Sequence, residues 1–395
     1  MNRRGMTLVE LMVSASIGMV VIAGVVSASM TMQASSGRLQ QVMGAQQSLR
    51  SAAELIELEL QKAGSGIGNT RLGLGGGVNR NTINVITGDT FSTDSTFEMP
   101  SGSYTGFPSD SVLVFSGRTS AMVQLACCPG IGTCGGSCSL RNGSASCTAV
   151  SASSSDFPTG SRVVYVNPTL GVACAHQVTS TPGANLLISS AGIGGLSAPL
   201  TGDVCADTST FWCTAGSYAM ELDAVSLRVN WKAVATGGPQ RPRLQVDSDG
   251  PYGPLPYVDI LWDVERLQLR SMIEDLTNPG TYTWFPDTAA GRPSIDTCTT
   301  TTPGCSIPGG TDAKDAALAA GLSANEALKA QFNRRLRGVE VILTSRSVTI
   351  DRSRIKRVGA VFAVDSNGFP QDGYERRRVV FQATPRNFGL LEGFQ

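Results

Sequence analysis

The most marked pattern along the chain is an apolar run near its N-terminus. From Leu11 to Met32, over 22 residues, the sequence contains no Asp, Glu, Lys, Arg or Pro. A helix needs about 20 predominantly apolar residues to cross a bilayer. A secretory signal peptide would instead have a shorter apolar core, followed by a small-residue cleavage site. The pattern therefore predicts a transmembrane helix over residues 11–32.

The helical pattern continues beyond the apolar run. Between Gln33 and Lys62 there is again no proline, and a set of residues recurs at spacings of three and four, which places them on one face of a helix. These residues are Leu39, Val42, Gln46, Leu49, Ala53, Ile56 and Leu60. We expect one long helix over residues 6–62, about 85 Å at 1.5 Å per residue. Its outer half should pack against the rest of the chain, and it should end at the glycines of AGSGIGNT.

The remaining sequence has the pattern of short strands separated by Gly-, Pro- and Ser-rich loops. Segments rich in β-branched and aromatic residues predict strands at 81–87, 111–117, 121–126, 161–166, 185–189, 217–222, 224–231, 338–346 and 377–384. Residues 312–338 predict one or two short helices, with Thr311 or Asp312 as N-cap and breaks at Gly321 and Ser323. The predicted fold class is α+β: one long helix, then a globular head over 63–395 built on an elaborated antiparallel sheet, with C-terminal sheet elements at about 257–395.

Composition excludes several classes of function. The chain has 31 basic and 31 acidic side chains, so it does not resemble a nucleic-acid-binding protein as a whole. A single histidine argues against a histidine-based metal site or a Ser-His-Asp triad. The segments DSDGPYG (247–253) and DSNGFPQDG (365–373) lack the distant Glu of a calcium loop and are interpreted as turns. No catalytic residues, metal or cofactor are predicted, and the chain is not expected to be an enzyme.

Basic residues are in excess near the C-terminus. From Gln331 to the end there are twelve basic and six acidic residues, including Arg376, Arg377 and Arg378. An acidic partner is one interpretation, and a solvated strand face is the favoured one, because exposed charges are the usual case.

The cysteines indicate an oxidising compartment. There are ten, and all are disulfide candidates: Cys127, Cys128, Cys134, Cys138, Cys147, Cys174, Cys205, Cys213, Cys298 and Cys305. A zinc site within CCPGIGTCGGSC is the less favoured alternative, because its spacing is not that of paired CxxC motifs and no histidine is near. The local pairs favoured by spacing are Cys205–Cys213 and Cys298–Cys305, but the connectivity stays open.

Two finer expectations concern neighbouring cysteines. Cys127 and Cys128 are adjacent and are not expected to bond to each other, because disulfide geometry needs more separated backbones. Cys174 and His176 could suggest a thiol–imidazole pair. We favour a disulfide-bonded Cys174, with His176 as an ordinary surface residue.

The residues before the apolar run predict its orientation. Arg3 and Arg4 would hold this end on the cytoplasmic side, so that the head is exported. The plausible processing point, Gly5–Met6, precedes the run, and cleavage there would keep the span in the mature chain.

At this point the sequence carries a resemblance. GMTLVEL (5–11) resembles the processing motif of type IV prepilins, in which a membrane peptidase cuts after the glycine and methylates the new N-terminus. The resemblance implies a leader at 1–5, cleavage at Gly5–Met6, methylation of Met6, and Glu10 as the acid used in filament assembly. Most members have Phe where this chain has Met6. Pseudopilins of secretion systems share the motif.

Four further segments resemble the large minor pilins of the PilW class, in the same order and spacing. They are ELQKAGSGIG (59–68), VERLQLRSM (264–272), RRLRGVEVILTSRS (334–347) and ERRRVVFQATPRNFG (375–389). The middle of the chain, about 70–255, resembles no family. The resemblance implies a minor pilin that is inserted into or caps a type IV pilus and primes its assembly.

The same resemblance implies partners and a location. The partners would be the prepilin peptidase/methyltransferase, other minor pilins and the major pilin, with a tip adhesin as a further candidate. The chain would lie in the inner membrane with a periplasmic head, and later in the extracellular pilus. The alternatives are a pseudopilin of a type II secretion system and an adhesive or ligand-binding tip subunit.

Glu10 is costly beside an apolar span and therefore needs a partner. It lies four residues after Met6, which is about one helical turn. Cleavage would create a positive N-terminus there, and pairing is the usual way in which a buried ion is tolerated. The amine could be its own or that of a neighbouring subunit. The simpler alternative is an interfacial acid stabilised by the helix N-terminus.

Overall fold

The computed structural model describes most of the chain. The described residues are 8–88, 96–124, 157–168, 171–180, 187–188, 191–198, 205, 217–233, 240–319, 322–348, 350–359, 361–366 and 368–386. They divide into two compact units. The first contains Met1–Ser48 and Arg346–Arg377, and the second contains Leu49–Ser345 and Arg378–Gln395. Each unit is described by itself.

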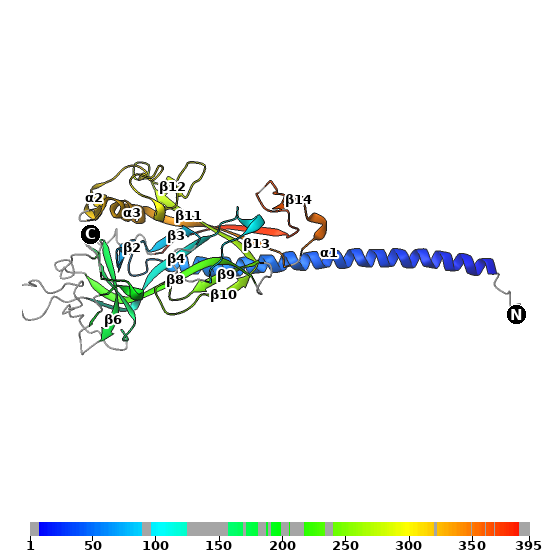
Figure 1. The fold of residues 1–395 in the computed structure, drawn as a ribbon, viewed down its shortest axis with the longest axis horizontal. Helices are drawn as coiled ribbons and strands as arrows, with labels where there is room; N and C mark the ends of the chain where they lie inside the picture. The colour runs from blue at the N-terminus through cyan, green and yellow to red at the C-terminus, as the bar shows by residue number, and fades with distance from the viewer. Residues whose placement is uncertain are drawn as a thin grey trace, which may run out of the picture. The chain divides into compact units, whose positions relative to one another are not determined.

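The long predicted helix is present. Helix α1 runs over Leu8–Lys62, which is 55 residues, and belongs to both units (Figure 1). It ends where the glycines begin. Gly64 has φ +69°, a conformation that favours glycine, and its N–H donates to the carbonyl of Phe115 at 2.9 Å. The glycine cluster thus ends the helix and fastens the chain to the nearby sheet.

The larger sheet of the second unit is built around the strand β8, Tyr218–Ala233. Among the described residues this sheet has ten strands, with the order β10-β9-β8-β5-β6-β1-β2 and with β3, β4 and β7 attached to it. Its other strands are β1 (Arg71–Gly75), β2 (Val78–Arg80), β3 (Ile83–Thr87), β4 (Asp110–Gln124), β5 (Arg162–Asn167), β6 (Val172–Ser180), β7 (Leu187–Ile188), β9 (Gln240–Asp247) and β10 (Val258–Trp262). Short 3-10 helices are η1 (Gly102–Tyr104), η3 (Ile193–Gly195) and η4 (Ile295–Thr297).

This sheet differs from the sequence-based prediction in several details. The strands predicted at 217–222 and 224–231 are one strand, β8, because Asp223 between them pairs with Ser116 of β4 and continues the ladder. The strands predicted at 111–117 and 121–126 likewise belong to one strand, β4, as far as Gln124, and β1, β2, β6, β9 and β10 were not predicted. In addition, β1 pairs in parallel with β6, Arg71 lying opposite Val172. The long connection between these strands leaves either direction possible, and a local pattern cannot distinguish them.

The smaller sheet lies against the helix in the hydrophobic core. Its order is β12-β11-β13-β16, with β12 at Tyr282–Phe285, β11 at Val264–Glu274, β13 at Leu336–Arg346 and β16 at Arg376–Ala383. Strand β13 was predicted at 338–346, whereas β11 was not; the two pair antiparallel, with Leu269 opposite Val341. Buried and partly buried residues alternate along β11, which is the pattern of a sheet with one covered face.

The helical segment at 312–338 contains two helices, α2 (Ala313–Ala319) and α3 (Ala324–Arg335). At the start of α2, the Asp315 N–H donates to the Asp312 carboxylate at 2.7 Å, and the Asp312 N–H donates to Asp315 at 3.0 Å. Ser323 caps α3 by accepting from the Glu326 N–H. These caps agree with the predicted N-cap and break.

One expectation about the head is wrong. His176 was expected at the surface, but it lies in the interior of β6 with only 1% of its surface exposed. Its ring stands edge-on to Tyr165 of β5, with centroids 6.2 Å apart. The pairing of β5 with β6 places both rings inside the head, which the local sequence does not indicate.

Candidate assembly site on the N-terminal helix

The candidate site begins at the first turn of α1. Glu10 lies in that turn and is exposed, and the Ser14 hydroxyl donates to the Glu10 backbone carbonyl at 2.7 Å. A carboxylate is favourable at a helix N-terminus because the unpaired N–H groups there carry partial positive charge. Gly5 and Met6, the predicted processing residues, lie outside the described residues. The structure therefore positions Glu10 on a helix and leaves the cleavage point as a prediction.

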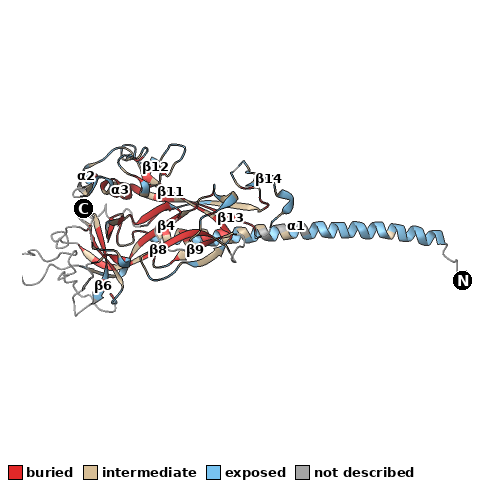
Figure 2. Cartoon of the chain, viewed as in Figure 1, coloured by how far each residue is buried: buried red, intermediate tan, exposed pale blue. Residues whose placement is uncertain are grey.

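The side chains of the apolar half of α1 are exposed. Its large side chains are between 46% and 76% exposed from Leu8 to Met32, and Figure 2 shows this part of the helix in the exposed colour. The helix is long and apolar enough to cross a membrane. Apolar surface of this extent is unfavourable in water and indicates a binding surface for lipid or protein.

Hydroxyl groups within the apolar half are satisfied inside the helix, a feature that the sequence analysis did not anticipate. Ser16 donates to the Met12 carbonyl at 2.8 Å, and Thr31 donates to the Ser27 carbonyl at 2.9 Å. Each bond joins residues four apart, as the Ser14 bond does. Such bonds remove the need for water, so these residues are compatible with an apolar environment. The presence of Ser and Thr within the predicted apolar helix was the available signal, because such a hydroxyl can bond the carbonyl four residues earlier.

The outer half of α1 packs as predicted from Leu49 onward. Leu49, Ile56 and Leu60 are at most 2% exposed and share one hydrophobic core with residues of both sheets. Their partners include Val112, Leu227, Trp231, Leu269 and Val341. The predicted face begins too early, however, because Leu39 is 63% exposed. The three–four spacing is continuous along the helix, whereas burial starts only at Leu49, where the second unit begins.

Two disulfides join cysteines of the described residues. Cys298 and Cys305 are bonded, with their Cα atoms 5.5 Å apart, which is the local pair that the spacing indicated. Cys205 bonds to Cys174 instead of to Cys213. An added Cβ at Gly73 would lie 2.4 Å from the Cys205 sulfur, so the glycine of β1 makes room for this bond beside β6. Long-range strand pairing, which spacing cannot reveal, therefore corrects the predicted Cys205–Cys213 pair.

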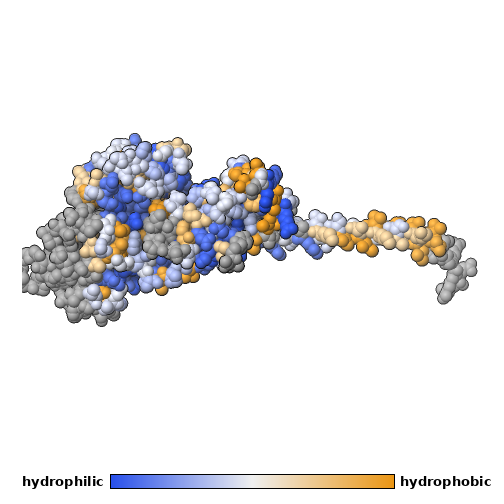
Figure 3. Space-filling model, in the orientation of Figure 1, coloured by the Kyte–Doolittle hydropathy of each residue, from blue (hydrophilic) through white to orange (hydrophobic). Residues whose placement is uncertain are grey.

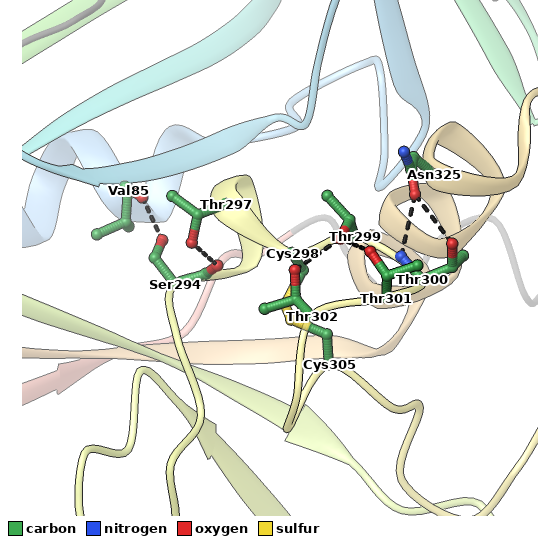
Figure 4. Close-up of a disulfide and its surroundings, with 10 residues drawn as sticks. All are labelled: Val85, Ser294, Thr297, Cys298, Thr299, Thr300, Thr301, Thr302, Cys305 and Asn325. Carbon is green, nitrogen blue, oxygen red and sulfur yellow. Dashed lines mark hydrogen bonds between the residues drawn. A yellow bond between two sulfur atoms is a disulfide. The ribbon is translucent and has the colours of Figure 1, made fainter.

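The other six cysteines, Cys127, Cys128, Cys134, Cys138, Cys147 and Cys213, lie outside the described residues. Figure 4 shows how the Cys298–Cys305 loop is held. The Ser294 hydroxyl donates to the Val85 carbonyl at 2.5 Å, and the Thr300 N–H donates to the Asn325 side chain at 3.0 Å. The loop is thereby attached to β3 on one side and to α3 on the other.

Burial perturbs several carboxylates of the head. Asp110 of β4 accepts hydrogen bonds from the Leu269 N–H at 2.9 Å and from the Thr87 hydroxyl at 3.0 Å. Burial, opposed by these bonds, raises the pKa of Asp110 to about 6. Burial and the neighbouring Asp249 carboxyl raise the pKa of Asp247 to about 7. These groups connect strands within the head and are far in sequence from the helix surface.

The segments that resemble calcium loops form turns. Asp247 accepts from the Asp249 N–H at 3.2 Å, and Asp365 accepts from the Phe369 N–H at 2.8 Å. Within the described part of the chain, no group of three or more His, Cys, Asp or Glu residues is arranged to hold a metal ion. The candidate functional surface is therefore the exposed apolar half of α1.

The comparison with family models decides the character of this helix. Residues 1–26 match the prokaryotic N-terminal methylation motif. The chain thus carries an N-terminal methylation motif. A solved structure described as a type IV-like pilin from Thermus thermophilus is similar at 9% identity, covering 87% of this chain and 96% of that one, with a TM-score of 0.28. A likeness of this size supports no further conclusion. The comparison with curated proteins gives no match.

The matched residues cover the beginning of the apolar half of the helix. The methylation motif implies processing by a prepilin peptidase, and it is followed by an apolar helix that carries a β-sheet head with two disulfides among its described residues. The motif and the apolar helix together are consistent with a membrane-inserted N-terminal segment.

Proposed function

We propose that this chain is a minor pilin of a type IV pilus, cleaved between Gly5 and Met6 and methylated on Met6. Before cleavage the helix spans the inner membrane, with the N-terminus cytoplasmic and the head periplasmic. After cleavage the chain is inserted into or caps the filament and primes assembly. Its partners are the prepilin peptidase, the major pilin and other minor pilins, and its head presents a tip adhesin.

The observation that carries the proposal is the contrast between the halves of α1. Leu49, Ile56 and Leu60 are buried in the chain's own core, whereas the residues from Leu8 to Met32 are exposed. A bare apolar helix needs an apolar environment. Lipid provides it for the unassembled chain, and helices of other subunits provide it in a filament. One surface can serve both states because dispersion and hydrophobic contacts are not directional.

In the proposal, Glu10 sets the position of the new subunit along the helical bundle. A carboxylate beside an apolar span is poorly tolerated without a positive partner. Cleavage at Gly5–Met6 would expose an amine on a neighbouring subunit, and pairing with that amine would align the new subunit along the bundle. Serine and threonine residues of the span, by contrast, are satisfied within their own helix.

The division of the head supports a minor rather than a major subunit. The segments that resemble the PilW class coincide with β11, with the end of α3 and β13, and with β16, which form the smaller sheet and its edge. The unmatched middle, 70–255, supplies most of the larger sheet. Both sheets contribute to the core around the helix, and we infer that the larger sheet is an elaboration suited to a subunit of low copy number at the tip.

Deletion of the protein tests the proposed role. We expect surface pili to be lost or strongly reduced while the level of the major pilin in the membrane is unchanged. Restoration by the wild-type chain, but not by Gly5→Ala, would tie the phenotype to processing. Normal pili together with a loss of protein secretion would contradict the proposal and favour a secretion pseudopilin.

A further inference from the structure

A second apolar surface lies in the first unit, outside the helix. The segment Arg346–Arg377 contains η5 (Arg352–Arg354) and a small hairpin of β14 (Arg357–Val358) and β15 (Val361–Phe362). Val358 and Val361 face each other across the hairpin and are 68% and 51% exposed. Aliphatic pairs of this kind are normally covered in a hairpin that belongs to a core.

Further exposed aliphatic residues accompany this pair. They are Val348 (67%), Ile350 (47%) and Val364 (61%). We call these three residues together with Val358 and Val361 the hairpin patch. Figure 3 shows hydrophobic and hydrophilic residues side by side in the region that Figure 1 labels β14. The patch therefore has an amphipathic surface rather than a purely apolar one.

The charges around the hairpin patch are predominantly positive. The segment contains seven basic and four acidic residues. Three of the acids are in ion pairs within the segment: Asp351 with Arg354, Asp372 with Arg376, and Glu375 with Arg354 and Arg377. The fourth, Asp365, accepts from the Phe369 N–H. Three of the four acids are thus paired with arginines of the segment, which keeps an overall surplus of positive charge.

The surplus lies next to the exposed valines. Arg352, Lys356 and Arg357 are exposed, and in the part of the chain that the structure describes none of the three forms an ion pair with an acid. Arg357 stacks over the Phe362 ring at 5.0 Å, so its guanidinium stays at the hairpin. The Lys356 N–H donates to the Gln371 carbonyl at 2.9 Å, which holds the basic stretch to the neighbouring chain segment.

We propose that the hairpin patch is a membrane-surface contact, in which its aliphatic side chains enter the interfacial layer and its cations bind anionic lipid headgroups. Apolar residues interleaved with Lys and Arg are the composition of interfacial membrane-binding segments. Each Lys or Arg near an anionic surface adds to this attraction. A protein hot spot would instead be expected to centre on Trp, Tyr or other large anchors.

The position of the segment in the chain favours lipid as the occupant. It belongs to the same compact unit as Met1–Ser48, which contains the whole apolar span. The part of the helix in this unit that follows the span, residues 33–48, covers sixteen residues, about 24 Å at 1.5 Å per residue. The hairpin patch therefore belongs to the unit that the proposed function embeds in the membrane through its helix.

The inference rests on the membrane insertion in the proposed function, and photo-crosslinking separates the two. A benzophenone amino acid is placed at Val358 in the full-length chain, reconstituted in vesicles of phosphatidylethanolamine and phosphatidylglycerol. The same group at Val20, in the span, reports insertion. The same group at Leu255, which is 53% exposed in a segment without basic residues, is the matched control. Lipid adducts are detected by mass spectrometry.

We expect lipid adducts at Val20 and Val358 and only background at Leu255. The pair Lys356→Glu and Arg357→Glu should reduce the Val358 adduct several-fold while leaving the Val20 adduct unchanged, and vesicles of phosphatidylcholine alone should have a similar effect. Adducts at Val20 without adducts at Val358 would overturn the inference alone. A protein–protein adduct at Val358 would overturn it in favour of a second copy, and the absence of adducts at Val20 would overturn both proposals.

Discussion

At the scale of single residues, environment rather than residue type determines what the charged groups of this chain do. Glu10 lies at the start of an exposed apolar helix, whereas Asp110 is buried between strands and accepts two hydrogen bonds. Both are acids that the fold must accommodate. The first is proposed to act between subunits, and the second acts within the head.

Replacing Glu10 tests the assembly contact. We expect Glu10→Ala to be cleaved normally but to be incorporated poorly into pili, because the amine of the neighbouring subunit loses its partner. Glu54→Ala, at an exposed acid of the same helix outside the apolar half, is the control and should be incorporated normally. The measurement is the ratio of the processed chain in sheared pili to that in membranes. Equal ratios for both variants would reduce Glu10 to an interfacial acid.

Replacing Asp110 tests the effect of burial on its carboxyl. Because its pKa is raised to about 6, the folded state binds this proton more tightly than the unfolded chain does. The resulting stabilisation of the folded state is fully present below about pH 4 and is lost as the pH rises through 6. At about 1.4 kcal/mol per pKa unit, the free energy of unfolding falls by up to about 3 kcal/mol over this range.

Asp110→Asn keeps an acceptor for the Leu269 N–H and cannot titrate. Its free energy of unfolding, measured by denaturant titration from pH 4 to pH 7, should therefore fall less with pH than that of the wild type. Asp247, whose pKa is about 7, should retain its own contribution, so the slope is reduced rather than abolished. An unchanged slope would show that Asp110 titrates normally.

At the scale of elements, the sequence predicts those structures whose pattern is local. The unbroken apolar run and the three–four spacing predicted α1, and the glycine cluster predicted its end. The alternation in β16 and the caps of α2 and α3 were also predicted, because each depends on neighbours within a few residues. The pairing of β1 with β6, the Cys174–Cys205 bond and the burial of His176 depend on residues far apart in sequence, so no local pattern could show them.

The candidate site was predictable to a similar degree. The motif GMTLVEL drew attention to Glu10, which lies in the first turn of α1, whereas the processing point at Gly5–Met6 stays a prediction. The spacing located the buried face from Leu49 to Leu60. The start of that burial was not predictable, because Leu39 and Leu49 occupy the same helical face yet are 63% and 2% exposed. The residues of the head that cover the helix reach only as far as Leu49. This limit is set by the folded head and not by the sequence of the helix.

Truncating a buried side chain of α1 tests the packing of its outer half. Ile56 is fully buried, and Ile56→Ala should lower the free energy of unfolding by about 2–5 kcal/mol. Leu58, two residues away and 50% exposed, provides the matched control. Leu58→Ala should change it by less than about 0.5 kcal/mol. Similar losses for the two variants, measured by denaturant unfolding in detergent, would contradict the described packing.

At the scale of the whole molecule, the helix is the surface for assembly and the head is the part that is cross-linked. The two disulfides close loops of different size, with sequence separations of 31 and 7 residues. In the chain-entropy account a longer closed loop restricts the unfolded chain more. The Cys174–Cys205 bond should therefore contribute more stability than the Cys298–Cys305 bond.

Pairwise replacement measures this difference. Removing Cys174 and Cys205 together should cost about 4 kcal/mol, and removing Cys298 and Cys305 together should cost about 2.5 kcal/mol. Denaturant unfolding of each double alanine variant provides the comparison, and non-reducing peptide mapping verifies the remaining bond. A larger loss for the shorter loop would contradict the expected order.

The central claim is that the chain becomes a filament subunit only after its leader is removed. The most direct test is mass spectrometry of the N-terminal peptide of this protein in pili sheared from cells. The account predicts a peptide that begins at Met6 and carries one added methyl group on its amine. A chain that still begins at Met1, or a processed chain found in membranes but never in pili, would contradict it.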